Sequence, residues 1–259
     1  QKVGVGMGLG SQRITLVKPE STASFQVRDV APDILLIANV GAVQLNYGVG
    51  LDECRHLVDS VGADALYLHL NPLQEVIQPE GDTNFKDLLP KIRHVAAELG
   101  VPVLIKEVGS GISGTLARQL AGTGIAAIDV SGGGGTSWAI IEAKRAHTPM
   151  QQSLGERFRD WGIPTTVSLV QCRDALPDMP LIASGGIRSG IDIAKAIALG
   201  ADAAALAHPF LDAATRSPEA VEDVLQRLIQ ELKVAMFLVG ARTIADLKGR
   251  RDLLVGVGR

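Results

Sequence analysis

Short apolar runs alternate with amphipathic stretches along the whole chain. The apolar runs are rich in Val, Ile, Leu, Ala and Gly, and the stretches between them carry apolar residues at helical spacing. This alternation is typical of repeated β/α units around a parallel sheet. The pattern predicts strands at Val3–Leu9, Ile34–Ala42, Asp64–Leu70, Val101–Val108, Ala126–Gly132, Pro180–Gly186 and Ala201–Ala207.

Helices are predicted between these strands, and glycine directly follows several of them. The left-handed conformation that commonly ends a helix favours glycine, which explains its place after these segments. The last predicted helix also has Ser217 as its N-cap and Pro218 at its first position. The predicted helices are Leu51–Val61, Phe85–Leu99, Gly114–Leu120, Ser137–Ala146, Ile191–Leu199 and Pro218–Val239.

The fold class follows from the number and order of these elements. A chain of 259 residues suits a single domain, so one domain over residues 1–259 is expected. A (β/α)8 barrel needs eight strands, and an open doubly wound sheet is the competing architecture. Because the chain begins at a strand, a barrel whose first strand lies upstream of Gln1 is favoured. Two long connections, Gly10–Asp33 and His147–Pro164, indicate functional or mobile loops.

Composition and charge exclude several classes of function. The net charge is −3 with acids and bases interspersed, so nucleic acid is not an expected partner. No apolar run approaches the ~18 residues of a membrane-spanning helix, so no membrane association is expected. Cys54 and Cys172 lack metal-ligand spacing and are expected to be reduced, which predicts a cytoplasmic protein.

Polar residues gather where two of the predicted strands end, which is where barrel enzymes carry their reactive groups. Gly10–Arg13 offers backbone amides, a hydroxyl and a guanidinium, a set that suits a diphosphate, although a solvated turn is at least as common. His69, Asn71, Gln74 and Glu75 follow the third predicted strand. Each alone could be a surface or rim residue, but together they indicate a site, and a carboxylate there could hold Mg²⁺.

Three further strand ends carry candidate flavin and phosphate contacts. Lys106 ends an apolar strand and is either a barrel salt bridge or an anion ligand, for example for a reduced flavin. Four consecutive glycines follow Ser131, which permits close backbone approach to a ligand. The strongest signal is the segment Ile182–Gly190, because backbone amides after the penultimate strand and in the next loop, Ala207–Pro209, form the usual phosphate site of such barrels.

With these residues in view, the chain resembles the type 2 isopentenyl-diphosphate isomerases, FMN-dependent (β/α)8 barrels. The match covers nearly the whole chain in order, and HLNPLQE is its most discriminating stretch. The matching stretches are MGLGSQR (Met7–Arg13), HLNPLQE (His69–Glu75), IKEVG (Ile105–Gly109), DVSGGGGTSW (Asp129–Trp138), ASGGIRSG (Ala183–Gly190) and GARTIADLKG (Gly240–Gly249).

The resemblance implies a role for each matching residue. Gln74 would be the catalytic contact at the allylic end of the substrate, and Glu75 would bind Mg²⁺. The implied substrate contacts are Ser11, Gln12, Arg13, His69, Asn71 and Gln74. The implied FMN contacts are Ser11, Asn39, Lys106, Ser131, Thr136, Gly185, Gly186, Ile187, Arg188, Ala207 and His208.

The activity that the resemblance implies is the reversible conversion of isopentenyl to dimethylallyl diphosphate in isoprenoid biosynthesis. It would use reduced FMN, Mg²⁺ and NADPH as reductant, in a homo-oligomer such as a tetramer or octamer. Family members also carry an Arg-Lys pair and a Thr-Gly-Gly flavin loop upstream of the SQR stretch, and neither is in this sequence. Two alternatives stay open: an FMN-dependent α-hydroxy-acid oxidase or dehydrogenase, disfavoured because Gly132–Thr136 has no His or Arg, and a non-catalytic flavin-binding subunit.

Overall fold

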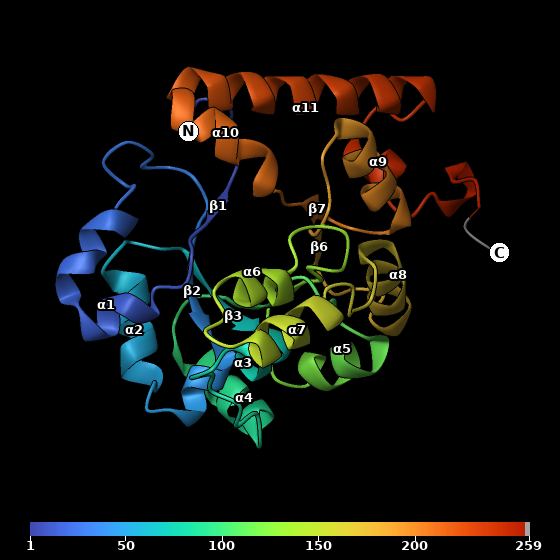
Figure 1. The fold of residues 1–259 in the computed structure, drawn as a ribbon. Helices are drawn as coiled ribbons and strands as arrows, with labels where there is room; N and C mark the ends of the chain where they lie inside the picture. Colours follow the sequence, from blue (N-terminus) through green and yellow to red (C-terminus); the bar gives the residue numbers. More distant parts are fainter. Residues whose placement is uncertain (257–259) are drawn as a thin grey trace. The chain divides into compact units, whose positions relative to one another are not determined.

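A computed structural model describes residues 1–256 of the chain (Figure 1). Seven parallel strands follow one another in the sheet in sequence order, from β1 to β7. The predicted strands are therefore all present, although each is shorter than expected, β1, β5, β6 and β7 most of all. Their bounds are β1 (Met7–Gly8), β2 (Leu36–Gly41), β3 (Ala65–Leu70), β4 (Val103–Glu107), β5 (Ala127–Asp129), β6 (Leu181–Ala183) and β7 (Ala203–Ala204).

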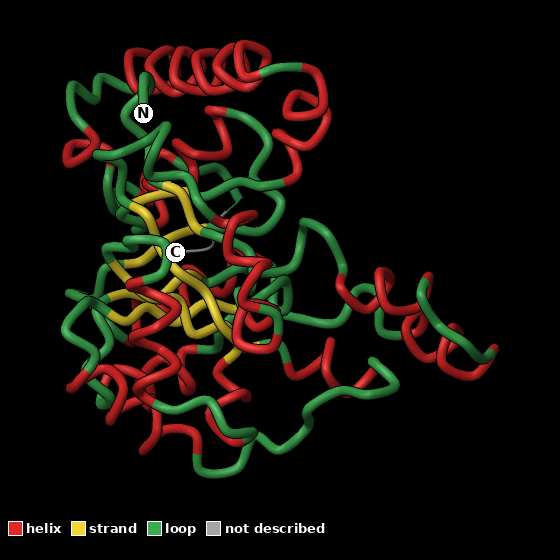
Figure 2. The backbone as a smooth tube through the Cα atoms, turned by 90° about the vertical axis from the view of Figure 1, so that its left-hand side faces the viewer, coloured by secondary structure: helices red, strands yellow, loops and turns green. Residues whose placement is uncertain are grey.

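Helices connect the strands, and they are drawn in red in Figure 2. The α-helices are α1 (Arg13–Val17), α2 (Leu51–Asp59), α3 (Pro72–Ile77), α4 (Leu88–Glu98), α5 (Gly114–Ala121), α6 (Trp138–Lys144), α7 (Pro149–Arg157), α8 (Thr165–Ala175), α9 (Gly190–Leu199), α10 (Leu211–Arg216), α11 (Pro218–Leu238) and α12 (Ile244–Leu247). Four 3-10 helices are η1 (Pro19–Phe25), η2 (Ala42–Asn46), η3 (His208–Phe210) and η4 (Arg251–Leu253).

The sequential parallel order confirms the predicted barrel class. An open doubly wound sheet reverses its strand order partway across, and no such reversal occurs in the order β1 to β7, so that alternative is wrong. The chain comprises seven of the strands of a (β/α)8 architecture. An eighth strand upstream of Gln1 stays a prediction.

The chain divides into two compact units, and the prediction of a single domain over residues 1–259 stays a prediction. Unit 1 comprises Gln1–Val108, Arg118–Ile128 and Trp138–Arg159. Unit 2 comprises Gly109–Ala117, Asp129–Ser137 and the residues from Asp160 onward.

The centre of unit 1 is the set of strands β2, β3 and β4. Nearly every residue of these strands is buried, as expected for parallel strands that are covered on both faces. Their register pairs Gly41 with His69 and His69 with Lys106. The polar residues at the carboxyl ends of neighbouring strands are thereby held at one level.

Helix ends in unit 2 follow the chemistry expected from the sequence. Ser189 begins α9 by accepting a hydrogen bond from the Asp192 N–H at 3.1 Å, and the Asp192 carboxylate accepts one from the Ser189 N–H. Ser217 caps α11 in the same way, as predicted. Gly190 lies where α9 meets α11, and an added Cβ would come within 2.4 Å of the Leu228 carbonyl oxygen. The two helices can therefore pack closely only because this residue is glycine.

The two segments predicted as long loops in fact contain helices. Gly10–Asp33 includes α1 and η1, and His147–Pro164 includes α7. Helix α8 also forms where no helix was predicted. Its first turn is rich in β-branched residues, which form helices poorly, and only Ser168, Leu169 and Cys172 are buried. Tertiary packing therefore stabilises these helices more than local propensity does.

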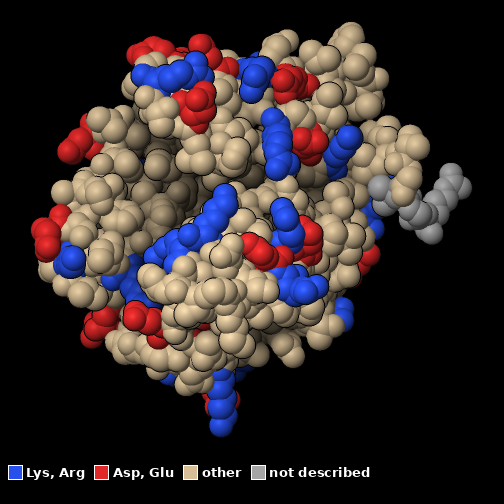
Figure 3. All heavy atoms as spheres, viewed as in Figure 1, with Lys and Arg blue, Asp and Glu red and all other residues tan. Residues whose placement is uncertain are grey.

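The remaining general features agree with the composition. Cys54 and Cys172 are both unpaired and buried, as expected for reduced cysteines. Basic and acidic side chains are intermixed on the face shown in Figure 3. Within residues 1–256, no helix combines the length and apolar character needed to span a membrane.

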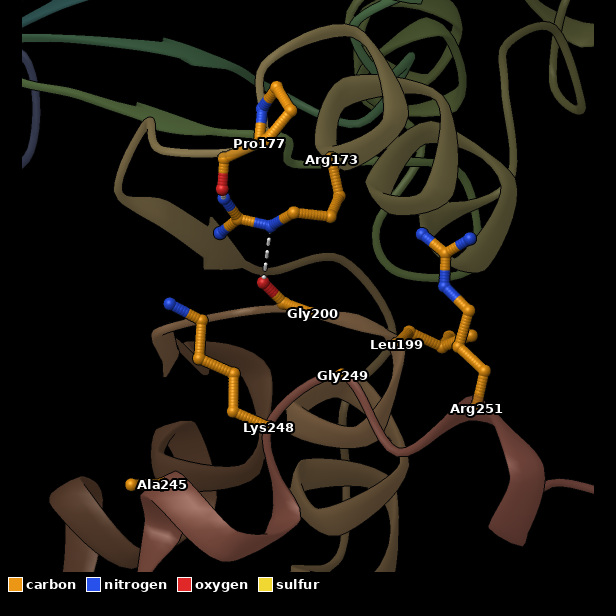
Figure 4. A pocket seen from close by; sticks show the side chains of 8 residues that line it. All are labelled: Arg173, Pro177, Leu199, Gly200, Ala245, Lys248, Gly249 and Arg251. Carbon is orange, nitrogen blue, oxygen red and sulfur yellow. Dashed lines mark hydrogen bonds between the residues drawn. The ribbon is translucent and has the colours of Figure 1, made fainter.

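Asp202 anchors the last part of unit 2 to its sheet. Its carboxylate accepts hydrogen bonds from the Leu181 N–H at 2.9 Å, from Arg173 at 2.7 Å, and from the Lys248 ammonium. Burial penalises the charged form, but these hydrogen bonds and the neighbouring positive charges outweigh it, so the pKa of Asp202 lies below its ordinary value. Figure 4 shows the pocket beside this cluster, which is lined by Arg173, Pro177, Leu199, Gly200, Ala245, Lys248, Gly249 and Arg251.

We expect Asp202→Asn to lower the free energy of unfolding by about 1–2 kcal/mol, because charge-assisted hydrogen bonds are lost at a partly exposed site. A lowered folded-state pKa means that this contribution is present above the unfolded-state pKa and disappears as the pH falls through the folded-state value. Denaturant unfolding at several pH values measures the difference between wild type and variant. Asp223→Asn, at an exposed position on α11, is the control. An Asp202→Asn deficit that does not shrink in acid would contradict this account.

Candidate active site

Asn39, His69 and Lys106 lie on three neighbouring strands of unit 1 and form a polar cluster. His69 and Lys106 are near the carboxyl ends of β3 and β4, and Asn39 lies further inside β2. The Asn39 Nδ2 atom donates to the Leu9 carbonyl at 2.8 Å, and its Oδ1 atom lies 2.8 Å from His69 Nδ1. The Lys106 ammonium donates to the Glu107 carbonyl at 2.9 Å. The cluster thus offers an amide, an imidazole and an ammonium group, and the last two lie on paired residues of β3 and β4.

His69 is neutral in this cluster. Burial, with a smaller contribution from the charge of Lys106, lowers the pKa of His69 to about 3. Because Asn39 offers its amide oxygen, His69 Nδ1 carries the proton, and Nε2 is left as an acceptor. At neutral pH this histidine can accept a hydrogen bond from a ligand but cannot supply a positive charge.

The predicted diphosphate residues Ser11, Gln12 and Arg13 take three different positions. Gln12 is fully buried, with its amide donating to the Leu57 carbonyl at 3.1 Å and accepting from the Asn39 N–H at 2.9 Å. Ser11 is exposed in front of α1, and Arg13 opens that helix with its side chain 52% exposed. The Gln12 hydrogen bonds therefore fix the direction in which its two neighbours point.

The stretch after β3, where no helix was predicted, is the short helix α3. Pro72 occupies its first position, where a missing N–H costs nothing. The turn of helix brings Asn71, Gln74 and Glu75 together: Asn71 Nδ2 lies 2.7 Å from Glu75 Oε1 and 3.3 Å from Gln74 Oε1. Three of the predicted site residues thus form one hydrogen-bonded group.

One atom of this group has no partner. Asn71 Oδ1 is buried and, within residues 1–256, accepts no hydrogen bond. An orphaned buried oxygen costs about 1–3 kcal/mol, so such atoms are expected where a ligand completes the network. The position is suited to a donor such as a metal-bound water.

The donor set is also compatible with Mg²⁺. Glu75 is buried, and its oxygens accept from Asn71 and from the Asp82 N–H at 2.7 Å, which leaves lone pairs for a cation. No group of three His, Cys, Asp or Glu side chains in the described part of the chain is placed to hold a metal. The single carboxylate of Glu75 is of the kind that Mg²⁺ uses, since this ion takes one or two carboxylates and its other ligands from water and phosphate.

Two acidic residues of unit 1 that the sequence did not single out contact the predicted site residues. Glu142 of α6 is buried, and its Oε1 accepts from Gln74 Nε2 at 3.0 Å. Asp82 forms an ion pair with Arg13 at 2.8 Å and accepts from Gln44 at 2.9 Å. An acid among the apolar residues of α6 was a usable signal for Glu142, whereas Asp82 lies in a loop and gave none.

Unit 2 carries the glycine-rich candidate phosphate site, and its two loops pack directly on each other. An added Cβ at Gly185 would come within 2.1 Å of the Gly132 carbonyl oxygen, and one at Gly186 within 2.5 Å of the Gly134 oxygen. Both residues also have positive φ, at 97° and 79°. Close packing between the loops is thus one physical reason for the glycines, alongside any contact with a ligand.

Side chains of unit 2 tie these loops together. Arg188 donates to the carbonyls of Gly186 at 2.9 Å and Gly134 at 3.1 Å. The Thr165 hydroxyl, which sequence analysis did not identify, lies 2.6 Å from the Gly185 oxygen. The Ser184 hydroxyl donates to Asp129 at 2.5 Å. These contacts make the loop backbone rigid before any ligand is bound.

The backbone of the loops offers donors for a phosphate group. Among the described residues, the N–H groups of Gly185, Gly186 and Ile187 donate no hydrogen bond, and the same holds for Ala207 and His208. The loop after β6, which carries Gly185 to Ile187, and the loop after β7, which carries Ala207 and His208, are neighbours because β6 pairs with β7. The Ala205 N–H donates to the Ala183 carbonyl just before the loop after β7. Adjacent N–H groups without internal partners are the chemistry that a phosphate needs.

The other two predicted flavin contacts, Ser131 and Thr136, flank the four glycines. Ser131 adopts a positive φ of 36°, which is uncommon for a residue other than glycine. Its N–H lies 3.2 Å from the Asp129 carboxylate, and its carbonyl accepts from the Gly111 N–H at 3.2 Å. Thr136 is exposed. The bent backbone at Ser131 redirects the chain from β5 into the loop.

The chain is similar to a known protein family and to several curated proteins. Residues 66–254 match the model of the FMN-dependent dehydrogenase family. An isopentenyl-diphosphate delta-isomerase of Synechococcus sp. is 56% identical over 248 residues, covering 96% of this chain and 71% of that protein. Proteins of the same name from Nostoc sp. and Rickettsia bellii are 53% and 54% identical, with 96% of this chain and 71% and 72% of those proteins covered.

Solved structures show the same fold at lower identity. A crystal structure of mandelate oxidase with (S)-2-phenylpropionate superimposes with a TM-score of 0.60 and 20% identity, covering 95% of this chain and 77% of that one. At this identity the likeness concerns the fold alone. Because the family model covers most of the chain and curated relatives exceed half identity, the chain belongs to the FMN-dependent dehydrogenase family and, among its members, to the isopentenyl-diphosphate delta-isomerases.

Proposed function

We propose that this protein interconverts isopentenyl diphosphate and dimethylallyl diphosphate by a 1,3-proton shift that uses reduced FMN and Mg²⁺. The observation that carries the proposal is the buried group of Asn71, Gln74 and Glu75 on α3. A carboxylate suited to Mg²⁺ there lies next to an amide that is held in place. The names of relatives at 50–56% identity support the same assignment.

Unit 2 would hold the phosphate of FMN through the N–H groups of Gly185, Gly186, Ile187, Ala207 and His208. When bound, the reduced flavin would supply the acid–base chemistry of the proton shift at its N5 region. Arg188 would hold the phosphate loop in shape, since its guanidinium already binds two loop carbonyls. Ser131 and Thr136 are proposed as further flavin contacts.

In unit 1, Lys106 would place a positive charge beside the reduced flavin, and Asn39 would hold both His69 and the strand end. Ser11 is proposed to contact flavin and substrate. The neutral His69 would accept a hydrogen bond and so orient a ligand without titrating near neutral pH.

The diphosphate would be bound by charge. Arg13 would pair with phosphate oxygens, and Glu75 would hold the Mg²⁺ that neutralises the rest of the diphosphate charge. Gln12 would act by orienting Ser11 and Arg13, since both ends of its amide are engaged internally. Gln74 would orient the reacting carbons, with its amide fixed between Asn71 and Glu142.

Three finer proposals rest on the family resemblance and on the cysteine content: NADPH as the reductant, assembly into a homo-oligomer, and a cytoplasmic location. The alternative of an α-hydroxy-acid oxidase is disfavoured because Gly132–Thr136 carries no His or Arg. The direct test incubates the protein with FMN, Mg²⁺, NADPH or dithionite, and isopentenyl diphosphate. Formation of dimethylallyl diphosphate is expected, and flavin binding without turnover would favour a non-catalytic subunit.

For the flavin site, we expect Gly186→Ala to weaken FMN binding at least about tenfold, because a forced left-handed conformation costs about 1–3 kcal/mol and the new Cβ meets the Gly134 oxygen. Visible absorbance after dialysis measures bound flavin, and thermal unfolding reports the fold. Gly122→Ala is the control, because its added Cβ makes only an ordinary contact at 3.6 Å. Undiminished flavin absorbance in Gly186→Ala would count against the assignment.

For the metal site, we expect Glu75→Gln to retain flavin while kcat/KM falls about a hundredfold or more, through loss of the carboxylate that holds Mg²⁺. The loss should appear mainly in productive substrate binding. A Mg²⁺ titration of activity is the measurement, and Glu80→Gln, an exposed acid in the following loop, is the control. An unchanged Mg²⁺ dependence would show that Glu75 is only a structural residue.

For Gln74, we expect Gln74→Ala to lower kcat by about 10–100-fold while diphosphate affinity changes little. A group that orients the reacting carbons contributes mainly in the transition state. Steady-state kinetics and equilibrium binding of inorganic pyrophosphate separate the two effects. Gln78→Ala, one helical turn further along, is the control. Wild-type turnover in Gln74→Ala would remove the catalytic role.

A further inference from the structure

Asp82 lies in the loop between α3 and α4. It contacts Arg13 and Glu75, the two charged residues that are proposed to bind the diphosphate, directly and through Mg²⁺. Its carboxylate Oδ2 accepts from Arg13 at 2.8 Å and from Gln44 at 2.9 Å. Its backbone N–H donates to Glu75 Oε2 at 2.7 Å. One residue therefore links the arginine to the metal-binding carboxylate.

The loop that carries Asp82 is held closely against α3. An added Cβ at Gly81 would lie 1.8 Å from the Glu75 carbonyl oxygen, so the backbone there is in tight contact with the helix. The loop is also held by the Asn46 side chain, which donates to the carbonyls of Asn84 and Lys86. The Asp82 carboxylate is consequently in a defined place and not on a free surface loop.

We propose that Asp82 is a positioning residue for diphosphate recognition, which fixes Arg13 at a set place relative to Glu75. The inference rests on the proposed function and deepens it. Arg13 is half exposed, and a free arginine loses side-chain freedom when it is immobilised by a ligand. The ion pair with Asp82 leaves other guanidinium N–H groups to meet phosphate oxygens, while part of that freedom has already been lost.

The opposite effect, in which Asp82 competes with the diphosphate for Arg13 and repels it, has to be weighed. The side chain of Asp82 is 15% exposed, and its charge is already balanced by Arg13 and a hydrogen bond from Gln44. A paired carboxylate contributes little net repulsion, and a fixed arginine gives well-oriented charge-assisted hydrogen bonds. Positioning should therefore dominate over competition. Removing the Asp82 carboxylate should weaken diphosphate binding if Asp82 positions Arg13, and strengthen it if Asp82 competes for Arg13.

The experiment compares wild type, Asp82→Ala, Arg13→Ala and the double variant in the full chain loaded with FMN. Asp82→Ala removes the carboxylate but keeps the N–H that binds Glu75. Calorimetric binding of inorganic pyrophosphate with Mg²⁺ and steady-state isomerisation kinetics are the readouts. Asp87→Asn is the charge-matched control, because Asp87 is exposed and pairs only loosely with Lys86 at 3.9 Å. Asp82→Asn, which keeps an acceptor oxygen, tests partial rescue.

We expect Asp82→Ala to raise the Kd for pyrophosphate and the KM about tenfold, with kcat within about twofold of wild type. The Kd and KM of Asp82→Asn should lie between those of wild type and Asp82→Ala, and those of Asp87→Asn should match wild type. The double variant should be no weaker than Arg13→Ala alone, because Asp82 acts through Arg13. Unchanged or tighter pyrophosphate binding in Asp82→Ala, or additive losses in the double variant, would overturn the positioning role. A wild type that neither binds pyrophosphate nor isomerises would instead overturn the proposed function, and this inference with it.

Discussion

The parallel pairing of strands that are buried on both faces is the constraint on which the rest of unit 1 depends. Because β2, β3 and β4 have no solvent-facing side, a polar side chain in them must sit near a strand end or carry its own partners. His69 and Lys106 meet this condition near adjacent carboxyl ends, and Asn39, inside β2, meets it through its hydrogen bonds with Leu9 and His69. The register that satisfies the backbone thereby also assembles the polar cluster, so the fold and the candidate site have one cause.

A different constraint acts in unit 2, where two loop backbones approach each other more closely than side chains would allow. Gly185 and Gly186 face the carbonyls of Gly132 and Gly134, and Arg188 joins the loops by hydrogen bonds to two of their carbonyls. Carbonyl oxygens accept the hydrogen bonds between these loops, while the N–H groups of Gly185, Gly186 and Ile187 have no partner in the described part of the chain. This asymmetry gives the loops a local excess of donors, which is what an anionic group requires.

The sequence was a good guide wherever one residue type has one physical use. Strands were found because parallel strands are continuous apolar runs, and the cap of α11 was found because Ser217 and Pro218 each have a specific place at a helix start. Helix α7 was missed although Thr148 and Pro149 begin it with the same chemistry. Helix α8 was missed because its first turn is β-branched and it is held by packing on distant segments: the Ser168 hydroxyl donates to the Ile112 carbonyl at 2.7 Å. Such contacts join segments far apart in sequence and leave no local pattern.

Contacts between distant segments also explain why only part of the candidate site could be predicted from the sequence. Gln74 and Glu75 were predicted because several polar residues follow one strand end. Their surroundings were not predicted: Glu142, which binds Gln74, comes from another helix, and Asp82, which binds Arg13, comes from a loop. The partners of Gln12 were also invisible, since its amide is used by Leu57 and Asn39. Motifs in a sequence identify groups that can react, whereas the partners that orient those groups are chosen by the fold.

Glu75 and Glu142 are among the carboxylates that unit 1 keeps away from water, which is costly unless each charge has donors. Amide side chains supply some of them: Asn71 donates to Glu75, and Gln74 donates to Glu142. Because these amides direct their N–H groups toward the carboxylates, their oxygens are turned elsewhere, and Asn71 Oδ1 finds no donor among residues 1–256. The unsatisfied atom is thus a consequence of stabilising the buried charges. A ligand that brings a donor to Asn71 and a cation to Glu75 would complete the network, so the pattern of hydrogen bonds itself favours a hydrated metal ion at this place.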